Sequence, residues 1–222
     1  MAANEIVIFG AGQIAEVADF YFQHDSAYNV AAFTVDQEFL SAGQFRGRPV
    51  VAFEAVESLY PPDSYEFFVA LSYSGLNTLR AQKYQAAKSK GYRLVSYVSS
   101  KATTFPDFSC GENCFILEDN TIQPFVHIGS NVTLWSGNHI GHHSSIADHC
   151  FLASHIVVSG GVSIGEYSFI GVNATLRDHI SVGPRCIIGA GALLLSDAEE
   201  GGVYPPEATA RSKIPSSRIR NI

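Results

Sequence analysis

Four histidines stand within twelve residues in the segment NHIGHHSSIADH, from Asn138 to His149. Seven of the eight histidines of the chain lie between residues 127 and 179. A neutral imidazole takes up a proton near neutral pH and is also a common metal ligand. Three interpretations are therefore open: metal ligands, packed core residues, or one catalytic base among bystanders. The spacing follows neither the helical nor the strand period, so another kind of element must position these side chains.

A six-residue repeat supplies that element. Every sixth residue from Val98 to Leu194 gives seventeen positions, and fifteen of them are Ile, Leu or Val. The next residue is glycine at seven sites, and the fourth residue after the aliphatic one is small or β-branched. This period fits a triangular coil with three short strands a turn, in which each side places one aliphatic side chain on the axis. The small residue then fills the corner, and glycine supplies backbone freedom near the turn. The frame predicts about five coils of 18 residues.

The first 97 residues follow a different pattern, which predicts a small α/β domain with a parallel sheet. Short apolar runs alternate with a glycine-rich turn and amphipathic segments. The predicted strands are residues 5–9, 29–36, 65–72 and 92–98. The predicted helices follow the turn GAGQIA at 10–15 and cover 77–91. The chain therefore divides into an α/β domain at 1–97 and an all-β repeat domain at 98–222.

The glycine-rich turn between the first strand and the first helix lets a phosphate approach backbone N–H groups at the helix N-terminus. Asp36, at the end of the second strand, could accept a hydrogen bond from a ribose hydroxyl. A full dinucleotide-binding domain has six strands, so a nucleotide or nucleotide sugar is favoured over NAD. A purely structural turn is the alternative. The candidate substrate contacts are Gly10, Gly12, Gln13, Asp36, Leu71, Ser72 and Tyr73.

The repeat resembles the left-handed parallel β-helix of the hexapeptide-repeat acyltransferases. Joined to the small α/β domain, it resembles the bacterial nucleotide-linked amino-sugar N-acetyltransferases, which are related to the sialic-acid O-acetyltransferase group. The resemblance implies a Rossmann-like nucleotide-sugar-binding domain and a β-helix acyltransferase domain that ends in a C-terminal loop. It also implies acetyl-CoA as co-substrate, a homotrimer with CoA between neighbouring helices, and a place in polysaccharide biosynthesis.

The same resemblance selects His142 as the catalytic base, because the family has a histidine just after the "IG" of a middle coil. The family usually has an acidic residue next, where this chain has His143. The partner that orients the base is left open among Asn138, Asp148 and a neighbouring chain, and His143 is the alternative base. No histidine falls on an axial position, so the core interpretation fails for the set. The histidines are expected to project outward or lie near corners.

The thioester side of the site follows from the segment SGGVSIG. Gly160 falls where the family offers a backbone N–H to the thioester carbonyl, although a glycine also suits a tight coil corner. The family's second histidine position is Phe151 here, and His155 is the candidate to replace it. Two further expectations concern the cofactor. Gly189 and Ala190 would line the pantetheine groove, and Arg211 and Lys213 would meet the CoA phosphates.

A metal site and a nucleophilic cysteine are not expected. His143 and His179 share one column but stand two coils apart, about 9–10 Å, which is too far to share one ion without a second chain. Cys114, Cys150 and Cys186 form an interior column at the same spacing, beyond disulfide reach. They are expected to be core residues in a reducing compartment.

The composition of the chain limits the kinds of partner that it is expected to bind. The net charge of −7 argues against nucleic acid. There is no apolar run of 18 residues and no secretory leader, so a cytoplasmic protein without a membrane span is expected.

These features together predict an acetyl-CoA-dependent N-acetyltransferase that acts on a nucleotide-linked deoxy-amino sugar. Attack on the thioester is expected to be direct, because no cysteine or serine is placed as a covalent carrier. The alternatives are O-acetylation of a sugar hydroxyl, a γ-carbonic-anhydrase-like metal lyase and a non-catalytic scaffold trimer.

Overall fold

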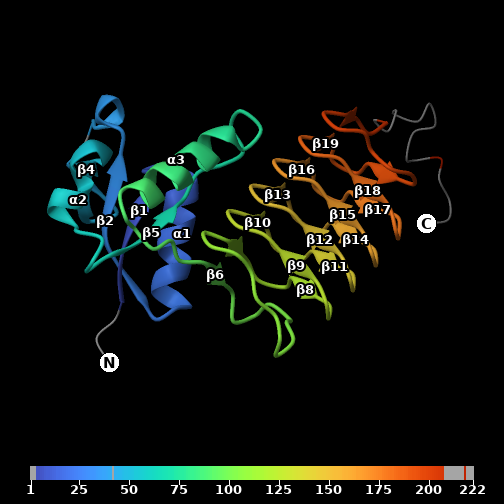
Figure 1. The fold of residues 1–222 in the computed structure, drawn as a ribbon, viewed down its shortest axis with the longest axis horizontal. Helices are drawn as coiled ribbons and strands as arrows, with labels where there is room; N and C mark the ends of the chain where they lie inside the picture. The colour runs from blue at the N-terminus through green and yellow to red at the C-terminus, as the bar shows by residue number, and fades with distance from the viewer. Residues whose placement is uncertain (1–3, 42, 208–217, 219–222) are drawn as a thin grey trace.

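A computed structural model describes residues 4–41, 43–207 and 218, and its chain forms an α/β domain followed by a β-helix (Figure 1). The helices and 3-10 turns of the first domain are α1 (Gln13–His24), η1 (Gln37–Phe39), η2 (Phe53–Ala55), α2 (Val56–Leu59) and α3 (Thr78–Ser89). Its strands are β1 (Asn4–Phe9), β2 (Tyr28–Val35), β3 (Gln44–Phe45), β4 (Arg48–Ala52) and β5 (Glu66–Val69). The sheet order is β3-β4-β2-β1-β5, with only β3 antiparallel to its neighbour.

The predicted strands at 5–9, 29–36 and 65–72 and both predicted helices are confirmed by β1, β2, β5, α1 and α3. The fourth predicted strand is wrong. Residues 92–96 touch the sheet only through the bridge between Leu94 and Phe67, and Tyr97–Val98 forms β6, which pairs with the β-helix. Strand β4, which lies between β2 and the two-residue edge strand β3, was missed because it is short and carries a proline, a residue that is depleted in strands.

Three parallel sheets form the sides of the β-helix, with two-residue strands stacked at intervals of 18 residues over most of its length. The first face contains β6 (Tyr97–Val98), β7 (Phe115–Ile116), β10 (Thr133–Leu134), β13 (Phe151–Leu152), β16 (Phe169–Ile170), β19 (Ile187–Ile188) and β21 (Val203–Tyr204). The second contains β8 (Thr121–Ile122), β11 (His139–Ile140), β14 (Val157–Val158), β17 (Thr175–Leu176) and β20 (Leu193–Leu194). The third contains β9 (His127–Ile128), β12 (Ser145–Ile146), β15 (Ser163–Ile164) and β18 (Ser181–Val182).

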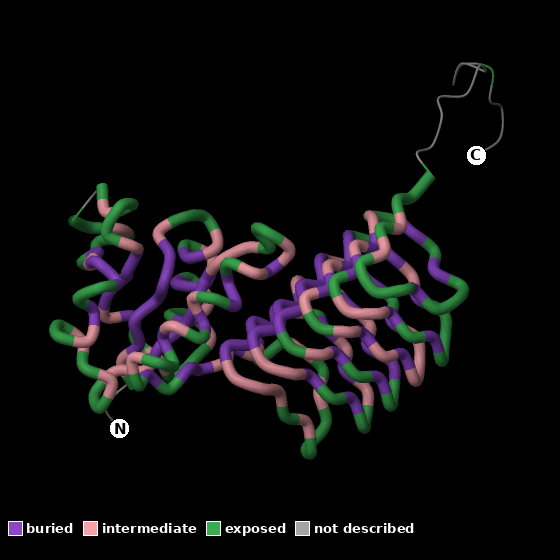
Figure 2. The backbone as a smooth tube through the Cα atoms, turned by 45° about the horizontal axis from the view of Figure 1, so that its top comes forward, coloured by how far each residue is buried: buried purple, intermediate pink, exposed green. Residues whose placement is uncertain are grey.

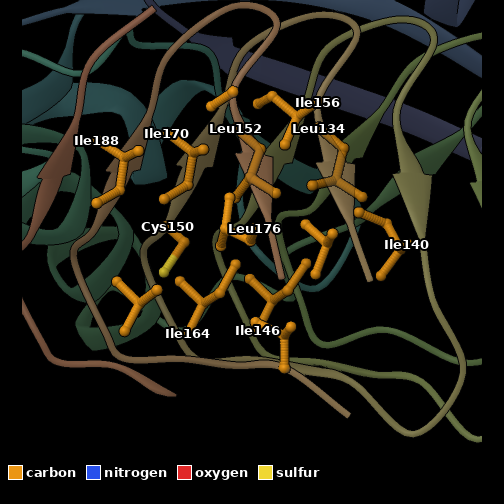
Figure 3. Close-up of a cluster of buried hydrophobic side chains, with 14 of the residues drawn as sticks. Leu134, Ile140, Ile146, Cys150, Leu152, Ile156, Ile164, Ile170, Leu176 and Ile188 are labelled. Atoms are coloured by element: carbon orange, nitrogen blue, oxygen red, sulfur yellow. The ribbon is translucent and has the colours of Figure 1, made fainter. Parts of the chain in front are cut away.

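The aliphatic residues of the six-residue frame point to the centre of the prism, as predicted (Figure 3). Leu134, Ile140, Leu152 and Ile170 are fully buried. This column of side chains is the hydrophobic core of the domain, and burying each one stabilises the fold by about 1.5–3 kcal/mol. The stacking also continues beyond Leu195, where the frame was expected to stop, because β21 pairs with β19.

The glycine after the aliphatic residue has a different role from the one predicted. A Cβ on Gly141 would stand 2.6 Å from the backbone nitrogen of Gly160 on the next coil. The left-handed backbone falls two places later, as at His143 (φ 59) and Asn173 (φ 58). Glycine is therefore needed for the close approach of adjacent coils, and polar residues such as Asn and His carry the turn itself.

The α/β domain packs on the first face of the β-helix and the corners beside it, and much of the chain is buried where the two parts meet (Figure 2). The Tyr21 hydroxyl donates to Glu118 at 2.6 Å, and Asp25 accepts from the Tyr97 hydroxyl at 2.7 Å. At the corner between the third and first faces, the side chain of Arg80 extends from α3. Its fully buried guanidinium donates to the carbonyls of His149 (3.2 Å) and Cys150 (3.1 Å). It also donates to Asn77 Oδ1 and to the Thr133 hydroxyl.

Replacing Arg80 with methionine is expected to lower the free energy of unfolding by about 3 kcal/mol. Burial lowers the pKa of Arg80 to about 10, so the side chain stays charged at neutral pH while it satisfies these buried acceptors. Methionine fills the volume and leaves them without a donor. Urea unfolding measures the change. The control is Arg177→Met, at an exposed position, which should change the free energy of unfolding by less than about 0.5 kcal/mol.

Candidate active site

The corner between the second and third faces brings together the residues that can do chemistry. His142 and Gly160 stand two places after the axial residues of β11 and β14, so they are neighbours on successive coils, about 4.8 Å apart. Gly161 and His179 occupy the next column, above His143. We call these five residues, His142, His143, Gly160, Gly161 and His179, the histidine corner.

The ring of His142 is exposed and lies against Gly160. Its backbone N–H donates to Gln123 Oε1 at 2.8 Å, which anchors the residue to the coil below. A Cβ on Gly160 would stand 2.7 Å from Cε1 and 2.8 Å from Nε2 of the ring. The outer ring nitrogen of His142 therefore lies beside the Gly160 backbone, and only glycine leaves room for it.

Gly160 also presents a free donor at the same place. Within the described ranges, nothing accepts a hydrogen bond from its N–H. Its carbonyl accepts from the His179 N–H at 3.0 Å, and the Gly161 N–H donates to the His142 carbonyl at 2.8 Å. The corner thus combines an imidazole nitrogen with an unpaired backbone N–H, which are the two groups that acyl transfer requires.

His179 is a residue of this corner to which the sequence assigned no role. A Cβ on Gly161 would stand 2.5 Å from His179 Nδ1, so the two imidazoles of His142 and His179 flank the Gly160–Gly161 dipeptide. The 18-residue period places residue 179 directly above residue 161, so the sequence alone could have predicted that His179 lies beside Gly161. Nothing in the repeat itself indicates which way the ring turns.

Neither of the two residues proposed to orient His142 does so within the chain. Asn138 is buried and donates to the Trp135 carbonyl at 2.5 Å. Asp148 accepts from the Ser130 N–H at 2.7 Å, on the corner between the third and first faces. The contact that the structure gives to His142 Nδ1 is instead His143 Nδ1, at 3.1 Å.

His149 corrects the expectation that the packed-core interpretation fails for the whole set of histidines. It is only 7% exposed, with its ring against Tyr84 of α3 and against Tyr167. Its Nδ1 is 3.0 Å from Asn131 Nδ2. The residue does lie at a corner of the β-helix, but the α/β domain covers that corner. The repeat shows only that a histidine is not axial, and it gives no sign of a second domain above it.

The protein is expected to lose stability as the pH falls below about 6.5, the ordinary value for histidine. Burial lowers the pKa of His149 in the folded state. The His149 imidazole therefore binds a proton more readily in the unfolded chain than in the folded one. This linkage favours unfolding at acid pH. His149→Asn should flatten the fall between pH 7.5 and pH 5, because asparagine extends the ladder in which Asn113 donates to Asn131 at 2.8 Å. Urea midpoints measure it.

The matched control for that experiment is His155→Asn, at the same place in the hexad but exposed. It should keep the full fall in stability with pH. An equal flattening by both variants would contradict the assignment to His149.

The two glycines of the glycine-rich turn have different surroundings: Gly10 is closely packed, and Gly12 faces open space. Gly10 has φ 124, and a Cβ there would stand 2.8 Å from the Ala70 carbonyl oxygen, so its glycine is required by packing. Gly12 is the N-cap of α1, is exposed, and would meet nothing within 4 Å. Gln13, the first residue of α1, is also exposed. The N-terminus of α1 is thus open to an anion, while Gly10 only shapes the turn.

The other predicted substrate contacts already have partners in the protein. The carboxylate of Asp36 accepts from Lys83 at 2.5 Å. The Tyr73 ring packs on Phe151 and Phe169 of the first face, with centroids 5.0 and 4.8 Å away, although it is still 52% exposed. Leu71 packs against the apolar core around α3, and Ser72 lies beside it, half-buried.

The predicted cofactor contacts are dispersed over the β-helix. The exposed ring of His155 lies over Gly137 on the corner between the first and second faces, away from His142 in the same chain. Gly189 packs against Pro206, where a Cβ would clash, and Ala190 beside it is exposed. Arg211 and Lys213 lie outside the described residues.

The cysteines are core residues. Cys114, Cys150 and Cys186 are fully buried and free, as the column predicted, and Cys110 is free and half-buried. Burial raises the pKa of Cys150 to about 12, which keeps its thiol protonated and unreactive. Over the part of the chain that the structure describes, no three His, Cys, Asp or Glu side chains gather as a metal site would require. No described helix has the length and apolar character to cross a membrane.

Comparisons with known proteins agree with this fold. A model of the bacterial transferase hexapeptide repeat family matches residues 161–196. The perosamine N-acetyltransferase of Caulobacter crescentus, solved with CoA and GDP-perosamine, is 26% identical with a TM-score of 0.80, over 90% of this chain and 92% of that one. The chain is an acyltransferase built on a β-helix of hexapeptide repeats.

Two further solved structures share the fold of this acyltransferase. The acetyltransferase domain of PglB from Neisseria gonorrhoeae is 22% identical with a TM-score of 0.80, over 90% of this chain and 95% of that one. WeeI from Acinetobacter baumannii is 19% identical with a TM-score of 0.67, over 90% and 95%. At these identities the likeness shows the fold alone. No curated protein matches the chain.

Within one chain of the acyltransferase, the glycine-rich turn and the histidine corner lie at different corners of the β-helix. A cavity of about 770 Å³ opens between α1 and the corner that joins the first and second faces, and Gln13, Glu118 and Trp135 line it. The histidine corner is one corner further round the prism. The sequence did not single out Trp135, the only tryptophan of the chain, because nothing in the repeat indicates that α1 lies beside it.

Proposed function

We propose that this acyltransferase moves an acetyl group from acetyl-CoA to the amine of a nucleotide-linked deoxy-amino sugar. The observation that carries the proposal is the pairing of His142 Nε2 with the unpaired N–H of Gly160 on one exposed corner. The likeness to an enzyme solved with CoA and GDP-perosamine supports the choice of co-substrate and acceptor.

The reaction uses the histidine corner in two steps. The amine nitrogen attacks the thioester carbon while His142 Nε2 takes up the amine proton. The carbonyl oxygen becomes an oxyanion that accepts from the Gly160 N–H, an interaction worth about 3–4 kcal/mol in related chemistry. The carbon–sulfur bond then breaks, and the imidazolium returns its proton to the departing thiolate. No covalent acyl-enzyme is needed, and the buried cysteines do not offer one.

The co-substrate is held along the coils above Gly160 in this proposal. Gly189 and Ala190 line the pantetheine path, and His155 of a neighbouring chain is the candidate for the thioester region. The roles of Arg211 and Lys213 toward the CoA phosphates remain a prediction.

A homotrimer completes the site. The N-terminus of α1 and the 770 Å³ cavity beside it accommodate the nucleotide sugar, while His142 stands on another corner of the same chain. A second copy that packs its histidine corner beside this cavity would bring amine and base together. A cytoplasmic location and a role in polysaccharide biosynthesis follow from the nucleotide-linked acceptor.

A thiol-release assay tests the function. Purified protein is mixed with acetyl-CoA and a panel of nucleotide-linked amino sugars, each paired with the same sugar carrying a hydroxyl in place of the amine. We expect thiol release and an amide product with one amino sugar and none with its hydroxyl partner. Acetylation of the hydroxyl sugar alone would instead assign an O-acetyltransferase. One zinc ion per chain in the purified protein would contradict the mechanism.

A further inference from the structure

The contact between His142 and His143 replaces the carboxylate that the resembling family places beside its base. The two Nδ1 atoms stand 3.1 Å apart, and the rings are nearly perpendicular, at 86°. We infer that His143 is a positioning residue that holds His142 in the tautomer with the proton on Nδ1, so that the two imidazoles act as one base. This inference rests on the proposed function only for the step in which His142 accepts the amine proton.

The tautomers follow from the hydrogen bond. A single proton lies between two Nδ1 atoms, so one ring donates and the other accepts. For His142 to accept a proton at Nε2, its Nδ1 must carry the hydrogen and donate it to His143 Nδ1. His143 then carries its own hydrogen on Nε2, which faces away from the contact. The opposite arrangement puts a hydrogen on His142 Nε2 and leaves no base at the Gly160 side.

Both rings are held in place by their surroundings. The His142 backbone N–H is anchored on Gln123, and its ring lies against Gly160. The His143 ring packs on the Phe125 ring of the coil below, with centroids 4.7 Å apart. The His143 backbone is left-handed, with φ 59. Each ring is therefore fixed from a different side, and the shared proton joins them.

The charged groups around the pair are few. His179 faces it from the coils above, across Gly161, and Asp178 precedes His179 on the same exposed corner. The coil below contributes Gln123, Pro124 and Phe125, none of which titrates. In the described part of the chain no carboxylate accepts a hydrogen bond from either ring. The partner of the base is thus an imidazole alone.

An imidazole partner changes the pH range of the enzyme. A carboxylate beside a histidine favours its charged form and raises its pKa, whereas a neutral imidazole does so much less. A second proton on the pair is opposed by the like charge of the first. Replacing the imidazole partner with a carboxylate is therefore expected to move the acid limb of the activity profile to higher pH.

Aspartate at position 143 is the informative substitution. Its carboxylate oxygen is as many bonds from Cβ as His143 Nδ1, and aspartate tolerates a left-handed backbone. We expect His143→Asp to keep kcat within about tenfold of wild type and to move the acid limb of the kcat profile up by about one pH unit. His143→Gly, which relieves the backbone and removes the acceptor, should lower kcat by about 10–100-fold. Asn173→Gly, at the same hexad position with φ 58 and exposed, should change neither.

Nitrogen NMR of ¹⁵N-histidine-labelled protein tests the tautomers without substrate. We expect His142 to carry its hydrogen on Nδ1 at pH 7.5 and to lose that preference in His143→Gly, with peaks assigned from the variants. A hydrogen on His142 Nε2 in the wild type, or a wild-type pH profile in His143→Asp, would overturn the inference. Absence of acetyl transfer with every sugar, with the tautomers as expected, would overturn the proposed function and leave the positioning role standing.

Discussion

Replacing His142 with alanine is expected to lower kcat for acetyl transfer by about a thousandfold, since a positioned general base contributes about 10²–10⁴ in rate. Alanine removes the Nε2 atom that lies beside the Gly160 backbone and leaves the corner otherwise open. The KM for acetyl-CoA should change little, because the pantetheine path and the Gly160 N–H remain. Steady-state thiol release at saturating acceptor measures the change.

The control for this experiment is His127→Ala, an exposed histidine at a strand position of the third face. It should leave kcat within about twofold, since surface substitutions away from a site rarely matter. Full activity in His142→Ala would show that another group takes the proton, and His143 and His179 would be the next to test.

The sequence predicted the β-helix almost completely because a solenoid is specified by a local rule. Each coil contacts only its neighbours, so one aliphatic residue every sixth position is enough to fix the axis and its core. The same arithmetic could have placed His142 below Gly160 before any coordinates, because residues 18 apart must stack. What it could not supply was the direction of a ring, so the contact between His142 and His143 and the direction of the His179 ring came only from the structure.

The α/β domain was predicted less well because its elements depend on contacts far along the chain. Residues 92–98 look like a strand, but Tyr97 pairs with Phe115 and so starts the β-helix. His149 looks like an outward corner residue, but α3 covers it. In both cases the local pattern was correctly recognised, and packing between the domains decided the outcome.

The glycine-rich turn shows the limit of a motif more clearly. Gly10 satisfies the motif for a packing reason, because its Cβ would meet the Ala70 carbonyl, whereas Gly12 faces open space. Only the second glycine leaves its backbone free for a ligand. The sequence could not separate the two roles, since each needs the same residue. The nucleotide assignment therefore rests on the open helix N-terminus and not on the glycine pattern.

Replacing Gly160 with alanine is expected to lower kcat by about a hundredfold with little loss of stability. Gly160 does not need a positive φ, so alanine fits the backbone, but its Cβ would stand 2.7 Å from Cε1 and 2.8 Å from Nε2 of His142. The ring must turn away from the oxyanion donor, which separates the two catalytic groups. A positioned general base contributes about 10²–10⁴ in rate, so its displacement accounts for a loss of this size. Gly43→Ala, where a Cβ meets nothing within 4 Å, is the control.

The double variant decides whether the effect of Gly160→Ala acts through the ring. In a chain that already carries His142→Ala there is no imidazole to displace, so adding Gly160→Ala should lower kcat by much less than a hundredfold. Two effects that pass through one group are not additive, and the coupling measures how much they share. If the two losses multiplied in full, alanine at position 160 would be acting on the thioester alone, and the contact between Gly160 and the ring of His142 would have no part in catalysis.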